Sequence, residues 1–247
     1  GTDLLGNVSN ACTTPKFVVD KSSPINLDIK YSTPKLSKII SAITFNYYNA
    51  PVTVTLIAED STSGIKSFDW TYTKENGSSN VNKASDSGRF EFDSSERTAT
   101  ADIKLPNGTA EQYSGSFSFK ATDRAGNISD TYTDNKTVII VDTVAPTRTV
   151  EFSEPKEGSF EEGSKAYYDS NAFATITITE ANFYPEDVDL KVNDETYSDV
   201  SWTKSGDVWT GTVNFSNDGH YILKLNYSDR STNKMEEYVS GEIIIDE

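Results

Sequence analysis

The chain has 247 residues, enough for one large domain or for two modules of about 100 residues each. Only 35% of the residues are hydrophobic, which is low for a large single-core enzyme but sufficient for small β-sandwiches whose sheets each expose one face to water. The formal net charge is −16, which argues against nucleic acid and against an anionic membrane surface, because both attract clustered lysine and arginine.

Cys12 is the only cysteine, so the chain cannot form an intramolecular disulfide. Any β-sandwich in this chain must therefore rely on packing alone to hold its sheets together. The sequence contains no apolar run as long as the roughly 18 residues that a membrane helix needs, and we expect no membrane insertion.

Three segments line up on an aspartate that is followed four residues later by an asparagine and then by a β-branched run, and they begin near Asp3, Asp123 and Asp229. The copies are separated by 120 and 106 residues, which is the length of a module. Aspartate can accept hydrogen bonds from the backbone of such a turn, and a glycine three residues later can take the left-handed conformation. The third copy has Thr232 at the glycine position, so we predict that this turn differs or is strained.

Two further patterns recur with the turn. A β-branched run follows each copy. The runs at 138–141 and 243–245 suit a buried final strand. The strand expected at 17–20, in the incomplete N-terminal segment, is expected to dock on the next module or to pair with another copy. A Tyr-Tyr pair precedes each of two alternating Val/Ile/Thr stretches, 52–59 and 172–180, which have the period of half-buried strands. We therefore predict the closing hairpin and strand of a preceding module at 1–24, a first complete module at 25–142, a linker at 143–146 and a second complete module at 147–247.

Seven short strands are expected in each complete module, with a hairpin turn at 204–208. In the first module the predicted strands are 25–31, 51–59, 65–73, 89–93, 97–105, 115–122 and 134–142. In the second they are 147–153, 172–180, 187–193, 199–204, 208–215, 219–228 and 234–245. Residues 32–46 carry apolar side chains near helical spacing and predict a short helix.

Four segments, taken in their order and spacing, resemble bacterial immunoglobulin-like (Big-type) repeats of large surface proteins from Gram-positive bacteria. They are Ser63-Gly-Ile65, Asp123-Arg-Ala-Gly-Asn127, Val141-Asp-Thr-Val-Ala-Pro146 and Ile178-Thr-Glu-Ala-Asn-Phe183. The resemblance covers essentially the whole chain. It implies an all-β fold of tandem immunoglobulin-like β-sandwiches, an extracellular or cell-surface location, and a role as a stalk, an adhesin or an accessory module. The family shares no catalytic residues, so no residue role is carried over.

The aromatic residues are expected to serve the scaffold. Trp70, Trp202 and Trp209 belong to alternating strands, which directs them into a core rather than onto a carbohydrate-binding face. Adjacent tyrosines on an extended chain must point to opposite faces, so one ring of each pair, 47–48 and 167–168, should pack inward while the other stays accessible.

Little of the sequence suits catalysis. His220 is the only histidine and should begin a strand at the surface, and Cys12 has no histidine near it in sequence. A carboxylate pair for glycoside hydrolysis could be drawn from 38 acidic residues, but a small sandwich without a cleft-forming insertion is a poor host for one. We predict that the chain is not an enzyme. Lys120 and Lys224 lie opposite apolar neighbours on their strands and should be solvated, so we also predict no Lys–Asn isopeptide crosslink.

Calcium is the one metal that the sequence suggests. In an immunoglobulin sandwich the loop after the second strand and the last hairpin lie at the end where the chain enters, so the linker aspartate of one module can approach acidic residues of the next. This groups Asp20 with Glu59, Asp60 and Asp123 at the first junction, and Asp142 with Glu180 and Asp229 at the second. Such oxygen-rich groups suit Ca²⁺. We favour the simpler interpretation that Asp123 and Asp229 cap their turns and the other acids are solvated, because no dense Asp-x-Asp-x-Asp loop is present.

Three functions follow from these patterns. The first is a structural spacer that projects an adhesive or catalytic domain. The second is binding of a host secreted or surface protein, immunoglobulin among the candidates, or of a glycan, with segments 32–46 and 76–88 as the candidate surfaces. The third is an accessory module of a large extracellular polysaccharide-degrading enzyme. We expect a monomer that contacts neighbouring immunoglobulin-like modules and no nucleic acid.

Overall fold

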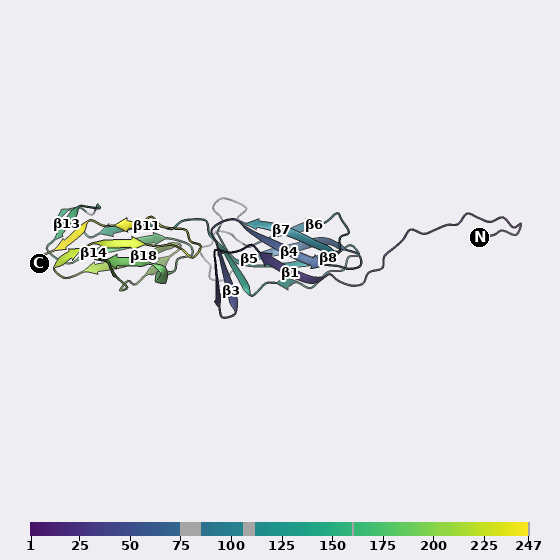
Figure 1. Ribbon diagram of the computed structural model, residues 1–247, viewed down its shortest axis with the longest axis horizontal. Helices are drawn as coiled ribbons and strands as arrows, with labels where there is room; N and C mark the ends of the chain where they lie inside the picture. Colours follow the sequence, from purple (N-terminus) through teal and green to yellow (C-terminus); the bar gives the residue numbers. More distant parts are fainter. Residues whose placement is uncertain (75–84, 106–111, 160, 247) are drawn as a thin grey trace.

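The computed structural model describes residues 1–74, 85–105, 112–159 and 161–246. Apart from one 3-10 helix, η1 (Pro185–Asp187), all regular structure among these residues is β, which confirms the predicted all-β class. Two sandwiches lie end to end, and the N-terminal segment extends away from the first of them (Figure 1).

The first sandwich packs a small sheet against a larger one. The small sheet has the order β1 (Ile25–Tyr31), β4 (Val52–Glu59), β7 (Thr98–Leu105). The larger sheet has the order β2 (Leu36–Ile40), β3 (Ile43–Tyr48), β10 (Thr137–Val141), β8 (Tyr113–Asp123), β5 (Ile65–Lys74), β6 (Asp86–Glu91), with β9 (Tyr132–Thr133) paired to β8. The strict alternation of β4 and β7 directs every second side chain into one core, where it meets aromatic rings from β5 and β8.

Gly115 of β8 lies so close to the neighbouring strand that there is no room for a side chain. A Cβ atom there would lie 2.2 Å from the carbonyl oxygen of Thr73 on the neighbouring strand. We expect Gly115→Ala to destabilise the first sandwich by about 2 kcal/mol, because the paired backbones must move apart. Calorimetry should show its unfolding transition at a lower temperature while that of the second sandwich stays in place. Gly126→Ala is the comparison, since its Cβ would meet nothing within 4 Å and only the positive φ of 94° costs energy, so we expect a smaller loss of about 1 kcal/mol.

The second sandwich is divided into three hydrogen-bonded sheets around one core. The first has the order β11 (Thr147–Phe152), β14 (Ala172–Thr179), β18 (Val208–Phe215), β17 (Thr203–Ser205). The second has the order β12 (Glu157–Gly158), β13 (Lys165–Tyr168), β22 (Glu242–Ile245), β19 (Gly219–Tyr221). The third has the order β16 (Glu195–Thr196), β15 (Asp189–Val192), β20 (Leu223–Asn226), β21 (Tyr238–Val239). The predicted hairpin turn at 204–208 joins β17 to β18, with Gly206 at a positive φ of 64°.

The β-branched runs at 138–141 and 243–245 form buried strands, as predicted. Strand β10 lies between β3, which runs parallel to it, and β8, which runs antiparallel. Strand β22 lies in the same way between β13 and β19. The run at 17–20 differs, because it forms no strand and Phe17 and Val19 are largely exposed. Neither sandwich offers this run the pair of neighbouring strands that encloses β10 and β22.

The predicted helix at 32–46 is wrong. This segment forms the antiparallel β2–β3 hairpin, whose two-residue turn is made by Ser41 and Ala42 at positive φ. Its isoleucines favour extended backbone, and β3 gains a full set of partners beside β10, so pairing prevails over the helical spacing. The hairpin projects from the first sandwich at the end that faces the second (Figure 1).

Several predicted strands of the second sandwich are shorter than expected, among them the strand at 187–193, of which Asp189–Val192 remains. Only Thr203–Ser205 remains of the strand near 199–204, and 234–245 contains the short strands β21 and β22. The strand expected at 219–228 is interrupted at Ile222, whose N–H donates to the side chain of Asn193 instead of to a neighbouring strand. Asn193 can reach it because it sits in a turn at a positive φ of 54°.

The three tryptophans pack against the cores, as predicted. Trp70 lies 6.0 Å from Phe117 between ring centroids, and Trp202 and Trp209 flank Phe183 at 5.2 and 5.0 Å. Inward-facing aromatic residues of this kind are the main apolar contribution to small cores.

The Tyr-Tyr pairs also place one ring each inward. Tyr48 and Tyr168 are buried, and their hydroxyls donate to the carbonyl oxygens of Ser32 and Ser153. Tyr167 is 44% exposed, as predicted for the second ring of a pair. Tyr47 is also only 2% exposed, so the prediction that one ring of each pair stays accessible is wrong for the 47–48 pair. The second sandwich covers Tyr47, as described below.

Candidate metal centres at the two junctions

Two groups of three acidic side chains lie where the chain enters each sandwich. Each group brings one carboxylate oxygen per residue within 4.8 Å of the others. The first consists of Asp20, Asp60 and Asp123, and the second of Asp142, Glu180 and Asp229. We call them the first and second acidic triads. Six of the seven residues predicted from sequence are therefore brought together.

Glu59 is the exception. Its carboxylate accepts a hydrogen bond from Nδ2 of Asn26 at 2.8 Å and takes no part in the first triad. Successive side chains of a strand point to opposite faces, so Asp60 follows the inward direction of Ala58 while Glu59 points away. Glu180 stands in the same relation to Ile178, two residues before it on β14.

The turn aspartates hold their own loops, as predicted. Asp123 accepts hydrogen bonds from the backbone N–H and Nδ2 of Asn127 at 2.8 and 2.7 Å. Asp229 does the same with Asn233 at 2.8 and 2.7 Å, and Asp3 with its own asparagine, Asn7, at 2.8 Å for both bonds. The amide of each asparagine in the two complete sandwiches also donates to the main-chain oxygen of the linker aspartate, which is Asp20 or Asp142.

Thr232 keeps the turn geometry at a cost in backbone strain. Its φ is +70°, a conformation that a β-branched residue rarely takes, whereas the first two copies have glycine there. We expect Thr232→Gly to stabilise the second sandwich by about 1 kcal/mol. The gain should be reduced by loss of the 2.9 Å hydrogen bond from Nδ2 of Asn49 to the threonine hydroxyl. Urea unfolding measures it, and Asn49→Ala gives the hydrogen-bond contribution alone. An unstrained turn would leave Thr232→Gly no more stable than wild type.

The second triad is almost fully shielded from water. Asp142, Glu180 and Asp229 are 0, 3 and 4% exposed. Burial, with Asp142 close by, raises the pKa of Glu180 to about 9. Burial also raises the pKa of Asp229 to about 6, although its bonds to Asn233 act in the opposite direction. Three carboxylates this close cannot all remain charged unless a cation compensates them, so the site must hold either a proton or a metal ion.

The first triad is compensated differently. Asp60 and Asp123 are 3 and 0% exposed, while Asp20 is half-buried. The carboxylate of Asp60 accepts the backbone N–H groups of Ser63 and Gly64, both at 2.7 Å. Hydrogen bonding from the N–H of Ser22 lowers the pKa of Asp20. Backbone donors thus supply part of the positive charge here. The interpretation that the acids beside the turns are solvated is wrong for Asp60, Asp142 and Glu180.

Asp142 is also the centre of the joint between the sandwiches. Its carboxylate accepts Nε2 of Gln112 from the first sandwich at 2.9 Å and Nδ2 of Asn182 from the second at 2.7 Å. Neither partner was predicted, although Asn182 lies only two residues after Glu180. A carboxylate that is completely buried and bonded on both sides fixes the linker to both bodies.

A tyrosine contact completes the joint. The hydroxyls of Tyr47 and Tyr184 lie 3.3 Å apart, and the rings meet edge to face at 6.5 Å. Tyr184 is covered in turn by the guanidinium of Arg230, which lies 3.4 Å from the ring centroid and pairs with Glu186 and Asp187. No periodic pattern in the sequence signals this contact, because it joins separate bodies through single side chains.

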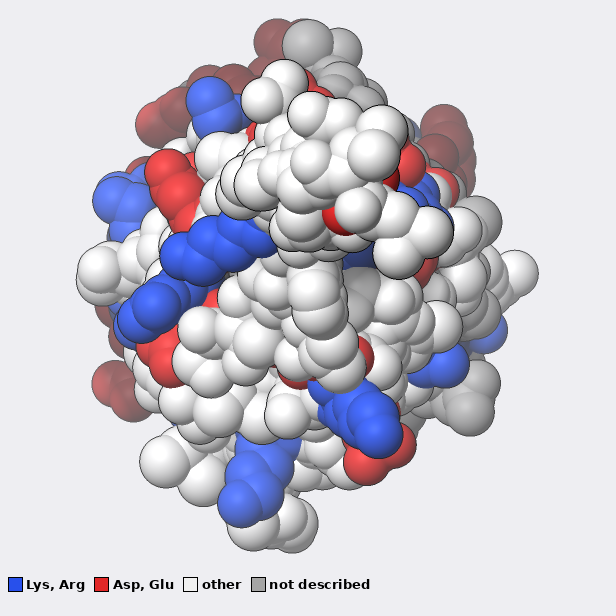
Figure 2. All heavy atoms as spheres, turned by 90° about the vertical axis from the view of Figure 1, so that its right-hand side faces the viewer, with Lys and Arg blue, Asp and Glu red and all other residues white. Residues whose placement is uncertain are grey.

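The remaining predicted residues are placed as follows. His220 is exposed on β19 with Nδ1 2.7 Å from the carboxylate of Glu242, and Cys12 is exposed in the N-terminal segment. Lys120 is exposed, and the amine of Lys224 pairs at 2.6 Å with Asp194, so neither is buried beside an asparagine. Figure 2 shows lysine and arginine side chains separated by uncharged and acidic surface on the face toward the N-terminus. In the described part of the chain, no helix has the length and apolar character needed to span a membrane.

Comparisons with known proteins give no family. No family model matches the sequence, and no curated protein matches it. Among solved structures, dimeric latent PorU from Porphyromonas gingivalis aligns at 10% identity and a TM-score of 0.31. The alignment covers 89% of this chain and 24% of that one. A likeness this weak carries no argument about function.

Proposed function

We propose that this chain is a non-catalytic, tandem immunoglobulin-like segment of a bacterial surface or secreted protein that acts as a stiff spacer presenting another domain. The observation that carries this proposal is the joint around Asp142. Bending at a linker normally costs little, but here it would break hydrogen bonds from Gln112 and Asn182 to a carboxylate that water does not reach.

The end-to-end arrangement supports the same role (Figure 1). Residues 1–20 carry the turn geometry that closes both sandwiches, so we propose that they close a preceding module and that the spacer continues in that direction. One exposed histidine and one exposed cysteine give the chain little means for catalysis. The resemblance to bacterial surface repeats supports the extracellular location.

We further propose that the acidic triads bind Ca²⁺. Calcium takes six to eight oxygen ligands, and each triad supplies three carboxylates drawn from the linker, a strand end and the closing turn. An ion there would compensate the buried charge and fasten the linker aspartate to the sandwich that follows it. The joint would then be stiffest where calcium is abundant.

Distance measurement between the sandwiches tests the spacer. Lys104 and Asn214 are exposed on the first and second sandwich, and cysteines there can carry spin labels once Cys12 is replaced by serine. We expect one narrow distance distribution in calcium that broadens on chelation. Tyr184→Ala should broaden it further, whereas Tyr167→Ala, an exposed tyrosine outside the joint, should not. A broad distribution in wild type under all conditions would contradict a stiff spacer.

A second candidate function rests on the β2–β3 hairpin, which presents Leu36, Ile39 and Ile40 at 42, 73 and 44% exposure. An exposed edge hairpin with aliphatic side chains suits contact with a host protein, immunoglobulin included, more than contact with a glycan. A screen against secreted host proteins and mucin glycans should be repeated with Ile39→Ser and Ile40→Ser. Loss of a signal in these variants would establish binding by the hairpin, and silence of the wild type favours the spacer. Of the other predicted surface, 76–88, residues 76–84 lie outside the described part of the chain.

A further inference from the structure

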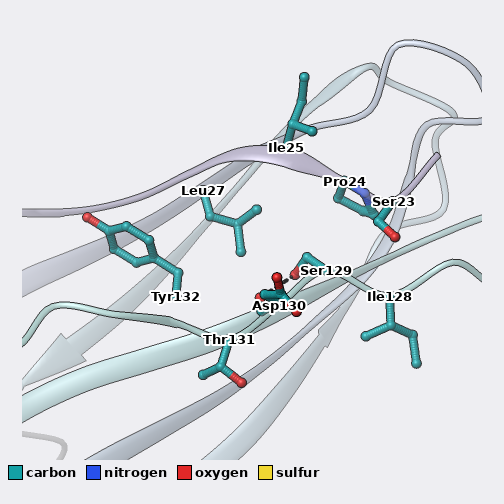
Figure 3. Close-up of a pocket in the computed structure, with 9 residues that line it drawn as sticks. All are labelled: Ser23, Pro24, Ile25, Leu27, Ile128, Ser129, Asp130, Thr131 and Tyr132. Carbon is teal, nitrogen blue, oxygen red and sulfur yellow. Dashed lines mark hydrogen bonds between the residues drawn. The ribbon is translucent and has the colours of Figure 1, made fainter.

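An open groove runs along the edge of the first sandwich, beside strand β1. Pro24, Ile25 and Leu27 line one side and Asp130, Thr131 and Tyr132 the other, around a volume of about 340 Å³ (Figure 3). We call it the β1 groove. In Figure 3 the side chains of Leu27 and Tyr132 face the space between the two segments.

The second sandwich has a position that corresponds to the β1 groove, and there the side chain of Arg148 fills the space. Arg148 lies two residues before Val150, which pairs with Ile176; Leu27 lies two residues before Ile29, which pairs with the corresponding Leu56. Tyr132 and Tyr238 each follow their turn aspartate by nine residues. Strand β1 has a register shift between Ile25 and Asp28, so Asn26 and Leu27 together stand where β11 has Arg148, and Leu27 is the one of the two that lines the groove. Tyr132 corresponds to Tyr238.

The contacts of Arg148 show which kind of side chain this position accommodates. Its Nε donates to the carbonyl oxygen of Glu236 at 3.0 Å, and its Nη2 to that of Glu237 at 2.8 Å. The guanidinium also lies over the ring of Tyr238, 4.8 Å from the centroid. The corresponding residues of the first sandwich, Asp130, Thr131 and Tyr132, line the β1 groove, where Leu27 is too short to fill the space and has no hydrogen-bond donor to offer. The carbonyl oxygen of Asp130 accepts the hydroxyl of Ser129 at 2.8 Å, which leaves its second lone pair for a further donor.

Negative charge is concentrated around this groove. Asp130 lines it. Burial raises the pKa of the Tyr132 phenol, and the nearby charges of Asp28 and Asp134 raise it further. In the second sandwich the residue corresponding to Asp28 is the uncharged Thr149, and that corresponding to Asp134 is Ser240. Both places are therefore acidic, since the second sandwich has Glu236 and Glu237 where the first has Asp130 and Thr131, and only in the second does an arginine of the chain occupy the place.

We propose that the β1 groove binds an arginine side chain presented by a partner polypeptide, in the way that Arg148 occupies the corresponding place of the second sandwich. Arginine fits better than lysine, because a planar guanidinium can donate to two neighbouring carbonyl groups while it stacks on a ring. This site is independent of the acidic triads and of the stiffness of the joint.

The test uses Nα-acetyl-arginine methylamide as the probe and the ¹⁵N-labelled full chain as the receptor. Titration should produce saturable chemical-shift changes at Leu27 and at 130–132. The matching lysine compound should bind at least about fivefold more weakly. Leu27→Arg should abolish the changes, since the new side chain occupies the groove. Absence of shifts, shifts confined to other surfaces, or unchanged binding by a folded Leu27→Arg variant would overturn the proposal.

Arg148→Ala gives a second, converse measurement. Removing this side chain opens the same place in the second sandwich, so the probe should now also shift the amides at 236–238. This holds even if Leu27→Arg does not fold. A folded Arg148→Ala chain that shows no new arginine-dependent shifts would contradict the proposed template, whatever the outcome of the distance measurements on the joint.

Discussion

In calcium-free buffer the second sandwich is expected to lose stability as the pH rises from about 5 to about 8, and calcium is expected to reverse the trend. The pKa of Glu180 is about 9 in the folded state, against an ordinary value of 4.5. Between these values the folded state holds a proton that the unfolded state has released. The free energy of unfolding therefore falls with rising pH, by at most about 1.4 kcal/mol per pH unit.

Asp229 adds to this slope at its acidic end. Its pKa is about 6 in the folded state, so between its ordinary value of 3.8 and 6 it also holds a proton that the unfolded chain releases. Over the whole interval the unfolding temperature of the second sandwich should fall by on the order of 10 °C in the presence of a chelator. Scanning calorimetry at several pH values measures this directly.

Calcium should oppose this loss, because an ion that binds only the folded state stabilises it by mass action. At a free concentration one hundred times Kd the gain is about 2.7 kcal/mol. The ion also displaces the proton from Glu180, so its effect should increase with pH. Superimposed scans in calcium and in chelator would refute the calcium proposal. If the pH slope nevertheless remained, the proton would be the group that compensates the buried charge.

Glu180→Gln tests whether both the pH dependence and the calcium response arise from the carboxyl group of Glu180. The amide preserves the shape of the side chain without an ionisable group, so both the slope and the calcium response of the second sandwich should largely disappear. At pH 8 without calcium the variant should be more stable than wild type. Glu59→Gln is the matched control, because Glu59 was expected in the first triad by sequence but lies outside it. An equal response in both variants would show that general screening, not the triad, is being measured.

The sequence predicts this region well because its signals are local. The spacing of Asp123 and Asn127 defines a turn, and the alternation of the strand that leads into Glu180 fixes the direction of that side chain. Topology then brings turn, strand end and linker to one end of the sandwich. Burial of the acids is a different matter, since an aspartate in a loop is ordinarily solvated and only the packed neighbours show otherwise.

The failures also have identifiable causes. Residues 36, 39, 40 and 43 are apolar at helical spacing, and the same residues suit a hairpin whose isoleucines prefer extended backbone. One ring of the 47–48 pair was expected to be accessible, because the alternation of a strand describes one sandwich and not the sandwich packed next to it. Tyr47 is in fact buried. Tyr184, which covers Tyr47, lies in a loop 137 residues later in the chain, so no local sequence pattern relates the two residues.

Asp142→Ala is expected to destabilise both sandwiches and loosen the joint. The change leaves Nε2 of Gln112 and Nδ2 of Asn182 without the acceptor that both now share. Buried donors that lose a partner cost about 1–3 kcal/mol each, so we expect a loss of about 3–4 kcal/mol near pH 5. Urea unfolding, with hydrogen exchange as the readout for each sandwich, measures the loss of stability of the two sandwiches separately. A loss confined to one sandwich would contradict the role of Asp142 as a link.

The loss should be smaller at pH 8 without calcium, because removal of Asp142 also removes a negative charge that repels Glu180 and Asp229. Asp20→Ala is the comparison at the first junction, where the half-buried aspartate should matter less. Asp142→Asn keeps an oxygen acceptor toward one neighbour while losing the charge that a cation requires. A variant that retains the narrow distance distribution but no longer responds to calcium would separate the joint from the metal site. If calcium and stiffness were instead lost together, the ion itself would be what fastens the two sandwiches.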